Sequence, residues 1–240
     1  MLGWQEIRQR YRRSVLGPFW LTLSTAAMVF AMGPLYGKLL NQPLSGYFAY
    51  LAISLITWFF ISSIINESCS VFISAESFIK QIKMPLSIYV LRCVWRNLIM
   101  FGHNLIVALV VMLFYPPETI RYLPLFLLGV MIIALNGVWL GLVLGLICAR
   151  FRDVPPIVAS LTQILFFLTP IMWRPEMLGA SRLAADLNPF FHFIEIVRAP
   201  LLGYPPTSVN VAWVLSITLL GFAVMLALFT RYRARIAYWL

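Results

Sequence analysis

Long apolar stretches alternate with short polar segments along the whole chain. Six stretches approach the roughly 20 residues that a helix needs to cross a hydrocarbon core about 30 Å thick. None of the six contains Asp, Glu, Lys or Arg, so no charge would be placed inside the bilayer. The pattern predicts an all-α polytopic membrane protein, one transmembrane domain over residues 1–240. The six predicted spans are 19–37, 47–65, 98–115, 123–148, 157–173 and 209–229.

Composition agrees with this pattern. Of the 240 residues, 62% are hydrophobic and only 11% are charged, and the mean hydropathy is +0.90. Soluble domains carry roughly 45–50% apolar and about 25% charged residues. A soluble enzyme, a disordered chain and a soluble nucleic-acid-binding domain are therefore disfavoured. The net charge of +10 indicates contact with an anionic lipid surface rather than with nucleic acid.

The distribution of Lys and Arg predicts the orientation. Thirteen of the 18 fall in segments on the same side as the N-terminus, and basic residues concentrate on the cytoplasmic side of membrane proteins. Both termini are therefore expected in the cytoplasm. The segment 66–97 becomes the longest cytoplasmic loop, and 174–208 becomes the longest outer segment.

Residues 1–18 are predicted to form an amphipathic helix in the membrane interface. Its basic residues are suited to lipid phosphates. The alternative is a simple basic anchor for the first span. The apolar residues recur at helical spacing at Trp4, Ile7, Tyr11 and Val15, and the basic residues are Arg8, Arg10, Arg12 and Arg13.

The cytoplasmic loop is expected to contain a short helix within Ser70–Ile82. Glu76 and Lys80 form an i,i+4 pair opposite an apolar face. A short, mostly apolar helix between spans fits a groove on a soluble partner, or it packs on the protein's own membrane base. The residues leave both interpretations open. The apolar face consists of Phe72, Ala75, Phe78, Ile79 and Ile82.

The outer segment 174–208 is long but rich in apolar residues. Asn188 is expected to cap a helix that has Pro189 at its first position and ends at Pro200. A second short helix is expected over Pro175–Leu187. Two half-length helices predict a re-entrant hairpin between spans five and six; the alternative is an amphipathic cover on the outer leaflet. The candidate gate residues are Phe190, Phe191, Phe193, Glu195 and Arg198, the last two spaced to neutralise each other.

Two further patterns lie inside spans. The second span carries aromatic and hydroxyl side chains on one broad face, and the fifth carries a weaker stripe. Such faces let sugar rings slide past, but ordinary helix packing with an interfacial aromatic belt explains them too. The candidate channel-lining residues are Tyr47, Tyr50, Ser54, Trp58, Ser62, Gln163 and Phe167. Gly137, Gly141 and Gly145 repeat every fourth residue in the fourth span, a packing signal within the chain or between subunits.

The chain shows no chemistry of its own. It has no metal-binding or nucleophile motif, no phosphate-binding loop and no acid inside a predicted span. We therefore expect no catalytic residue, no metal site and no cofactor on this chain. Transport work would have to come from another polypeptide.

These features together resemble the membrane subunit of type-2 ABC exporters, in the branch that exports bacterial cell-surface polysaccharides. The resemblance runs in order over nearly the whole chain. It is carried by RYRRSVLGPFW at Arg10–Trp20, ESFIKQIKMP at Glu76–Pro85, ARFRDVPPIV at Ala149–Val158, FFLTPIMW at Phe166–Trp173 and NPFFHFIEIVRAPLLG at Asn188–Gly203.

The resemblance implies a homodimer in the bacterial inner membrane, completed by two copies of a cytoplasmic ATPase that binds ATP and Mg. Arg10–Trp20 would match the family's gate helix, and Pro175–Ala199 its outer gate helices. The resemblance also favours docking for the cytoplasmic loop. The expected coupling residues are Glu76, Ser77, Phe78, Ile79 and Lys80.

The leading hypothesis is export of a lipid-linked polysaccharide, with O-antigen as the first candidate. Arg8, Arg10, Arg12 and Arg13 would attract the pyrophosphate of the lipid carrier. Export of capsular polysaccharide or teichoic acid is the alternative within the same class. The alternatives from other classes are an intramembrane lipid-modifying enzyme and a scaffold for a glycan-synthesis complex.

Overall fold

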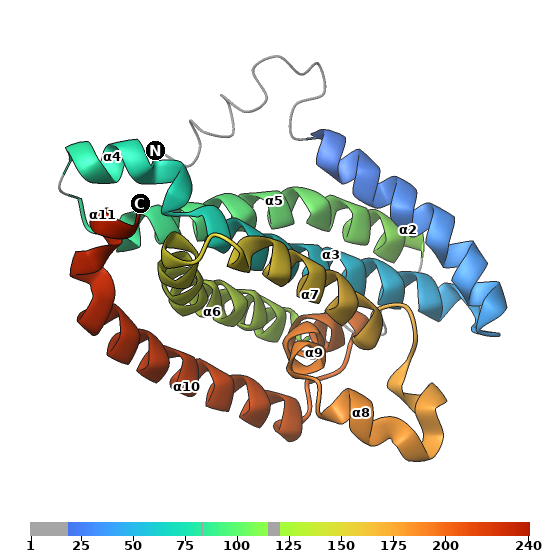
Figure 1. Cartoon of the computed structure of the whole chain (residues 1–240). Helices are drawn as coiled ribbons and strands as arrows, with labels where there is room; N and C mark the ends of the chain where they lie inside the picture. Colours follow the sequence, from blue (N-terminus) through green and yellow to red (C-terminus); the bar gives the residue numbers. More distant parts are fainter. Residues whose placement is uncertain (1–18, 83, 115–120) are drawn as a thin grey trace.

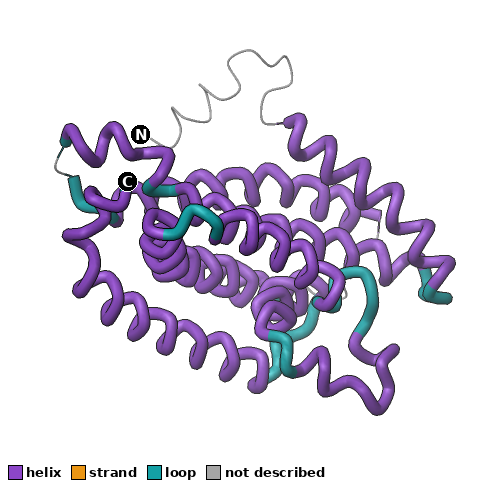
Figure 2. The backbone as a smooth tube through the Cα atoms, viewed as in Figure 1, coloured by secondary structure: helices purple, strands orange, loops and turns teal. Residues whose placement is uncertain are grey.

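The computed structural model describes residues 19–82, 84–114 and 121–240. Those residues are helical apart from short connections (Figure 1, Figure 2). The elements are α2 (Phe19–Leu39), α3 (Leu44–Ser70), η1 (Ile73–Ala75), α4 (Glu76–Gln81), α5 (Ser87–Phe114), α6 (Leu123–Arg150), α7 (Val154–Leu168), η2 (Pro175–Arg182), α8 (Leu183–Asp186), α9 (Pro189–Leu202), α10 (Ser208–Tyr232), η3 (Arg233–Arg235) and α11 (Ile236–Trp239), where η denotes a 3₁₀ helix. The predicted helix over 1–18 lies outside the described residues.

Among the described residues, four helices are long and apolar enough to cross a membrane. They contain the predicted spans 47–65, 123–148 and 209–229 and, up to Phe114, the span 98–115. The predicted spans 19–37 and 157–173 correspond to α2 and α7. Helix α7 is shorter than predicted: its 15 residues extend roughly 22 Å at 1.5 Å per residue. It ends at Leu168 because Thr169, which precedes Pro170, adopts an extended conformation.

Helix α3 lies at the centre of the bundle. It packs against α2, α5, α6, α7 and α9. Leu51, Leu55 and Ile56 are completely or almost completely buried. A helix that is apolar on every face is stable only where neighbouring elements cover all of its faces. The central position of α3 provides this cover.

The glycine repeat of α6 serves packing inside the chain. A Cβ atom on Gly141 would lie 2.5 Å from Val90 of α5, and one on Gly145 would lie 2.7 Å from Val71 at the end of α3. Gly137 faces the same two helices. Small residues let membrane helices approach closely, so these glycines set the distance between α6 and its neighbours.

Replacing Gly141 by Leu is expected to destabilise the protein by about 1–3 kcal/mol, because the new side chain overpacks the contact with Val90. The midpoint of thermal unfolding in detergent measures the loss. Gly102→Leu in α5 is the matched control, since its Cβ would meet no atom within 4 Å. Equal midpoints for the two variants would contradict a tight α5–α6 contact.

The two ends of the bundle carry different elements. Helices α4 and α11 lie side by side at one end, and η2 with α8 lies at the other (Figure 1). The former end holds Lys80, Arg92 and the arginines of residues 231–235, so it is the end that the charge pattern predicts to face the cytoplasm.

The outer segment differs from its prediction in two places. Asn188 caps α9 as expected, its Oδ1 accepting from the Phe190 N–H at 2.9 Å. The helix nevertheless runs past Pro200 to Leu202, where Gly203 closes it with a φ of 95°. The first half of the predicted hairpin is not one helix, because Gly179 adopts a φ of 50° and breaks it.

Candidate functional site

Helix α4 brings the five predicted coupling residues together on one exposed helix of six residues. It buries no side chain, and Phe78 is 57% exposed. The Lys80 Nζ donates to Glu76 Oε1 at 2.6 Å across one helical turn. Ser77 is also exposed, and Ile79 is half-buried. An exposed aromatic ring beside a polar face is suited to insertion into a groove of another protein.

The residues before α4 attach it to the bundle. Phe72 is fully buried and Ala75 is 2% exposed, whereas Phe78 and Ile82 of the same predicted apolar face point outward. Packing on the protein itself is therefore confirmed for the residues before α4, whereas docking stays a prediction for the exposed residues. The first turn of this loop packs on the protein itself, and its second turn presents an apolar surface.

Low pH is expected to break the ion pair between Glu76 and Lys80 on α4. The Lys80 ammonium lowers the pKa of the Glu76 carboxyl below its ordinary value of 4.5, mainly through the hydrogen bond. Because the pKa is lowered, the ion pair stabilises the protein at pH values above the ordinary pKa. This stabilisation is lost as the pH falls through the lowered pKa. A ¹³C NMR titration of the labelled carboxyl should show Lys80→Met raising this pKa and Lys80→Arg keeping it low. Equal pKa values in Lys80→Met and the unsubstituted chain would contradict the pairing.

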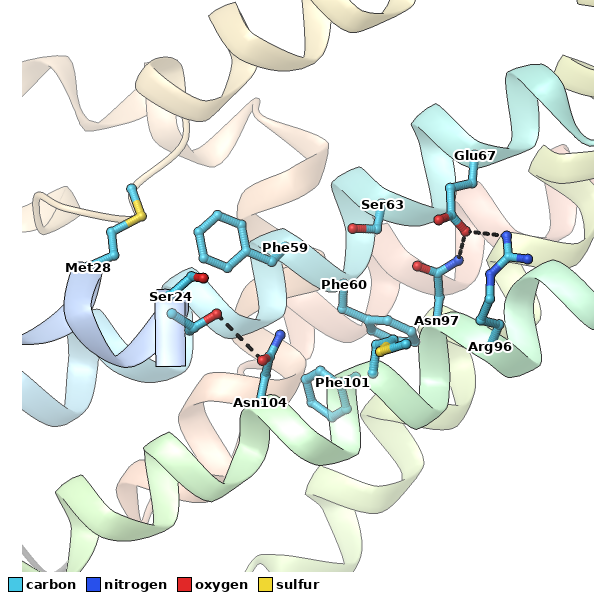
Figure 3. Close-up of a pocket in the computed structure, with 12 residues that line it drawn as sticks. Ser24, Met28, Phe59, Phe60, Ser63, Glu67, Arg96, Asn97, Phe101 and Asn104 are labelled. Carbon is cyan, nitrogen blue, oxygen red and sulfur yellow. Dashed lines mark hydrogen bonds and ion pairs between the residues drawn. The ribbon is translucent and has the colours of Figure 1, made fainter. Parts of the chain in front are cut away.

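A polar cleft of about 400 Å³ lies between α2, α3 and α5 (Figure 3). Its apolar lining includes the rings of Phe59, Phe60 and Phe101. Hydroxyls, amides and one ion pair beside aromatic rings suit a polar group that is carried by an apolar molecule. The polar lining comprises Ser24, Thr25, Ser63, Glu67, Arg96, Asn97 and Asn104.

Glu67 organises one end of the cleft. Its Oε2 accepts from Arg96 Nη2 at 2.7 Å and from Asn97 Nδ2 at 2.6 Å (Figure 3). These residues were expected in the loop 66–97, but they lie in helices, because α3 continues to Ser70 and α5 already begins at Ser87. Pairing offsets part of the cost of placing both charges within the helical bundle. The composition of the spans carried no signal for this cleft.

The aromatic stripe of α3 points into the protein. Tyr47, Tyr50, Ser54 and Trp58 are each at most 5% exposed. The Tyr47 hydroxyl donates to the carbonyl of Met172 at 2.7 Å, and the Tyr50 hydroxyl lies 2.9 Å from the carbonyl of Trp173. Of the four, Tyr50 lines a cavity of about 740 Å³ together with Arg198 and Glu195. The two tyrosines hold the connection between α7 and η2.

Arg198 of α9 joins the same cluster. It is 1% exposed, and its Nη1 donates at 2.8 Å to both Ser54 Oγ and the carbonyl of Pro170. Its Nε donates to Glu195 at 2.9 Å, as the predicted neutralisation requires. The guanidinium also lies 4.1 Å from the centre of the Tyr50 ring, a cation–π contact. One buried cation thus connects α9, α3 and the α7–η2 connection.

The aromatic residues of α9 face different neighbours. Phe190 makes an edge contact with Trp58 of α3 at 5.7 Å between ring centres, while Phe191 and Phe193 are buried. His192, fully buried, stacks on Trp213 of α10 at 5.2 Å. Helix α9 is therefore enclosed by protein on several sides, as the backbone of a hairpin within a membrane must be.

The remaining candidate residues are more open. Gln163 and Phe167 of α7 are exposed, the latter by 61%, and Ser62 of α3 is half-buried. Arg8, Arg10, Arg12 and Arg13 lie outside the described residues. Within the described part of the chain, no group of three or more His, Cys, Asp or Glu side chains could hold a metal ion.

Comparison with known proteins identifies the family. The family model described as ABC-2 type transporter matches residues 1–202, most of the chain. The chain belongs to the ABC-2 type transporter family. It is also 23% identical over 243 aligned positions to the O-antigen export system permease protein RfbA of Klebsiella pneumoniae, covering 97% of this chain and 91% of that protein.

Membership changes how the site is interpreted. An ABC-2 permease is a transport subunit, and its family implies an ABC ATPase as partner. For a transport subunit that works with a separate ATPase, the exposed helix α4 is a candidate contact with that partner.

Proposed function

We propose that the chain is the membrane subunit of an ATP-driven exporter that moves a lipid-linked polysaccharide across the bacterial inner membrane. O-antigen is the first candidate for this polysaccharide. The observation that carries the proposal is the end-to-end similarity to an O-antigen export permease, which covers 97% of this chain. If only a domain were shared with that permease, the similarity would support a transport role but would not indicate which class of molecule is transported.

The proposed assembly is a homodimer with six spans per subunit. Helices α2 and α7 would supply the first and fifth spans, and the α4 end would face the cytoplasm with both termini. The basic residues near α4 and α11 support this orientation. The enclosed helix α9 supports a re-entrant hairpin formed by segment 174–208.

In the proposed mechanism, α3 transmits motion from α4 to the outer hairpin. Phe72 and Ala75 attach α4 to the bundle directly after α3 ends. At the other end of α3, Tyr47, Tyr50 and Ser54 hold the α7–η2 connection and Arg198. ATP binding by the partner would displace α4, and this rigid path would shift the hairpin between two packed arrangements.

The polysaccharide would pass surfaces that are open in this chain. Ser62, Gln163 and Phe167 offer hydroxyl, amide and aromatic contacts to a moving glycan. Arg8, Arg10, Arg12 and Arg13 would attract the pyrophosphate of the lipid carrier at the cytoplasmic side. ATP and Mg would bind the partner ATPase, with no cofactor on this chain.

Deleting the gene in its host tests the proposal. The expected result is loss of one surface glycan, its accumulation inside the cell on a lipid carrier, and restoration by the intact gene. Accumulation of O-antigen inside the cell would support O-antigen as the cargo. Accumulation of capsular polysaccharide or teichoic acid would instead identify that polymer as the cargo. Normal surface glycans without intracellular accumulation would overturn the export function.

Purification tests the partnership separately. The tagged chain, extracted from its host in mild detergent, should retain a nucleotide-binding subunit in equal number and show ATP hydrolysis. A pure chain that retains no such subunit would contradict the ATP-driven exporter and would favour the scaffold alternative.

A further inference from the structure

The segment after α10 packs against α4. Elements η3 and α11 fold back beside α4 at the end of the bundle (Figure 1). Helix α4 buries no side chain of its own. Apart from the adjoining η1, α11 is its main packing neighbour among the described elements. The orientation of α4 therefore depends on α11.

Helix α11 is in turn attached to the longer helices. Ile236 is fully buried. The guanidinium of Arg150, the last residue of α6, lies 5.0 Å from the centre of the Trp239 ring, and Tyr232 of α10 contacts the same ring at 6.0 Å. Helix α11 therefore contacts the ends of both α6 and α10.

A groove of about 420 Å³ separates α4 from this segment. Ile82 and Met84 on its α4 side are 50% and 40% exposed. Such apolar surface is unfavourable in water, and a partner bound in the groove would cover it. One wall consists of Ile79, Ile82, Met84, Pro85 and Leu86, and the other of Arg233, Ile236 and Ala237.

Charge indicates what would fill the groove. Arg233 lies on its wall, and the neighbouring Arg235 is exposed. These arginines keep the segment out of the hydrocarbon core. The nearby acid on α4, Glu76, already pairs with Lys80. An apolar side chain flanked by Asp or Glu would complement both the groove and its basic rim.

We propose that this groove is the second half of the docking surface for the nucleotide-binding subunit, and that it receives an apolar side chain flanked by acidic residues. The inference rests on the proposed function. Phe78 projects into the partner while the partner inserts between Ile82 and Arg233, so α4 is held from two sides. The partner then acts on α6 through α11 as well as on α3 through α4.

Two alanines in the segment provide a matched test. Ala237 lines the groove, whereas Ala234 is exposed outside its lining. In the full complex, Ala237→Trp should fill the groove and reduce the nucleotide-binding subunit retained per tagged chain at least fivefold. Ala234→Trp should retain as much as the unsubstituted chain. Equal retention of the nucleotide-binding subunit by both variants would overturn the docking role of the groove, while the proposed function would stand.

Cross-linking identifies the occupant. Benzoylphenylalanine at position 84 of the full chain replaces a long, 40% exposed side chain of the groove wall, so it leaves the groove open. Irradiated in membranes that contain the complex, it should cross-link to the nucleotide-binding subunit. Mass spectrometry should place the link at an apolar residue next to Asp or Glu. Cross-links to lipid alone or to a second copy of the chain would overturn this inference. An unsubstituted chain that retains no nucleotide-binding subunit would overturn the proposed function itself.

Discussion

Replacing Arg198 by Leu is expected to lower the free energy of unfolding by about 3–5 kcal/mol, because it leaves a partly buried carboxylate without its partner. Arg198 is 1% exposed and Glu195 is 13% exposed. The change also removes the donor to Ser54 Oγ and to the carbonyl of Pro170, each at 2.8 Å. The thermal midpoint and the monodisperse fraction after extraction in detergent measure the loss.

An exposed ion pair of the same outer segment provides the control. Arg182 Nε lies 3.7 Å from Asp186 Oδ2, with side chains 54% and 42% exposed, so Arg182→Leu should cost at most about 1 kcal/mol. Adding Glu195→Gln to Arg198→Leu should restore part of the stability, because no uncompensated charge remains. If the two single variants unfold at the same temperature, Arg198 does not join α9 to α3.

Apolar length and capping chemistry could be predicted from the sequence. The spans 123–148 and 209–229 lie within helices α6 and α10, and Asn188 with Pro189 begins α9. These are local properties: a run of apolar residues has to be buried, and an amide oxygen beside a proline caps a helix wherever it lies. Distant residues hardly alter them.

The orientation of α3 could not be predicted. A helix that is apolar all round has no preferred buried face, so the stripe from Tyr47 to Trp58 was compatible with a channel or with the interior. The partners of its two tyrosine hydroxyls are backbone carbonyls about 120 residues away, and a carbonyl leaves no mark on residue identity. The Glu67–Arg96 pair was missed for a related reason. Its charges appeared as loop residues until tertiary contact neutralised them.

Replacing Phe78 by Asp is expected to reduce polysaccharide export at least tenfold without unfolding the protein. The ring is 57% exposed and α4 buries no side chain, so the bundle loses no packing. An apolar groove on the partner would have to desolvate the new carboxylate, which costs several kcal/mol when it stays unpaired. Surface glycan in the complemented deletion strain measures export, and the thermal midpoint checks the fold.

Two controls separate coupling from folding. Phe78→Leu keeps an apolar side chain on α4 and should retain most of the export. Tyr238→Asp, at a side chain that is 90% exposed in the adjoining helix α11, places the same charge at the same end of the bundle outside the groove lining, and it should reduce export far less than Phe78→Asp does. If Tyr238→Asp and Phe78→Asp reduce export equally, the effect is one of local charge and α4 has no specific coupling role. If Phe78→Asp exports normally while the ATPase stays bound, the work of ATP enters this protein elsewhere.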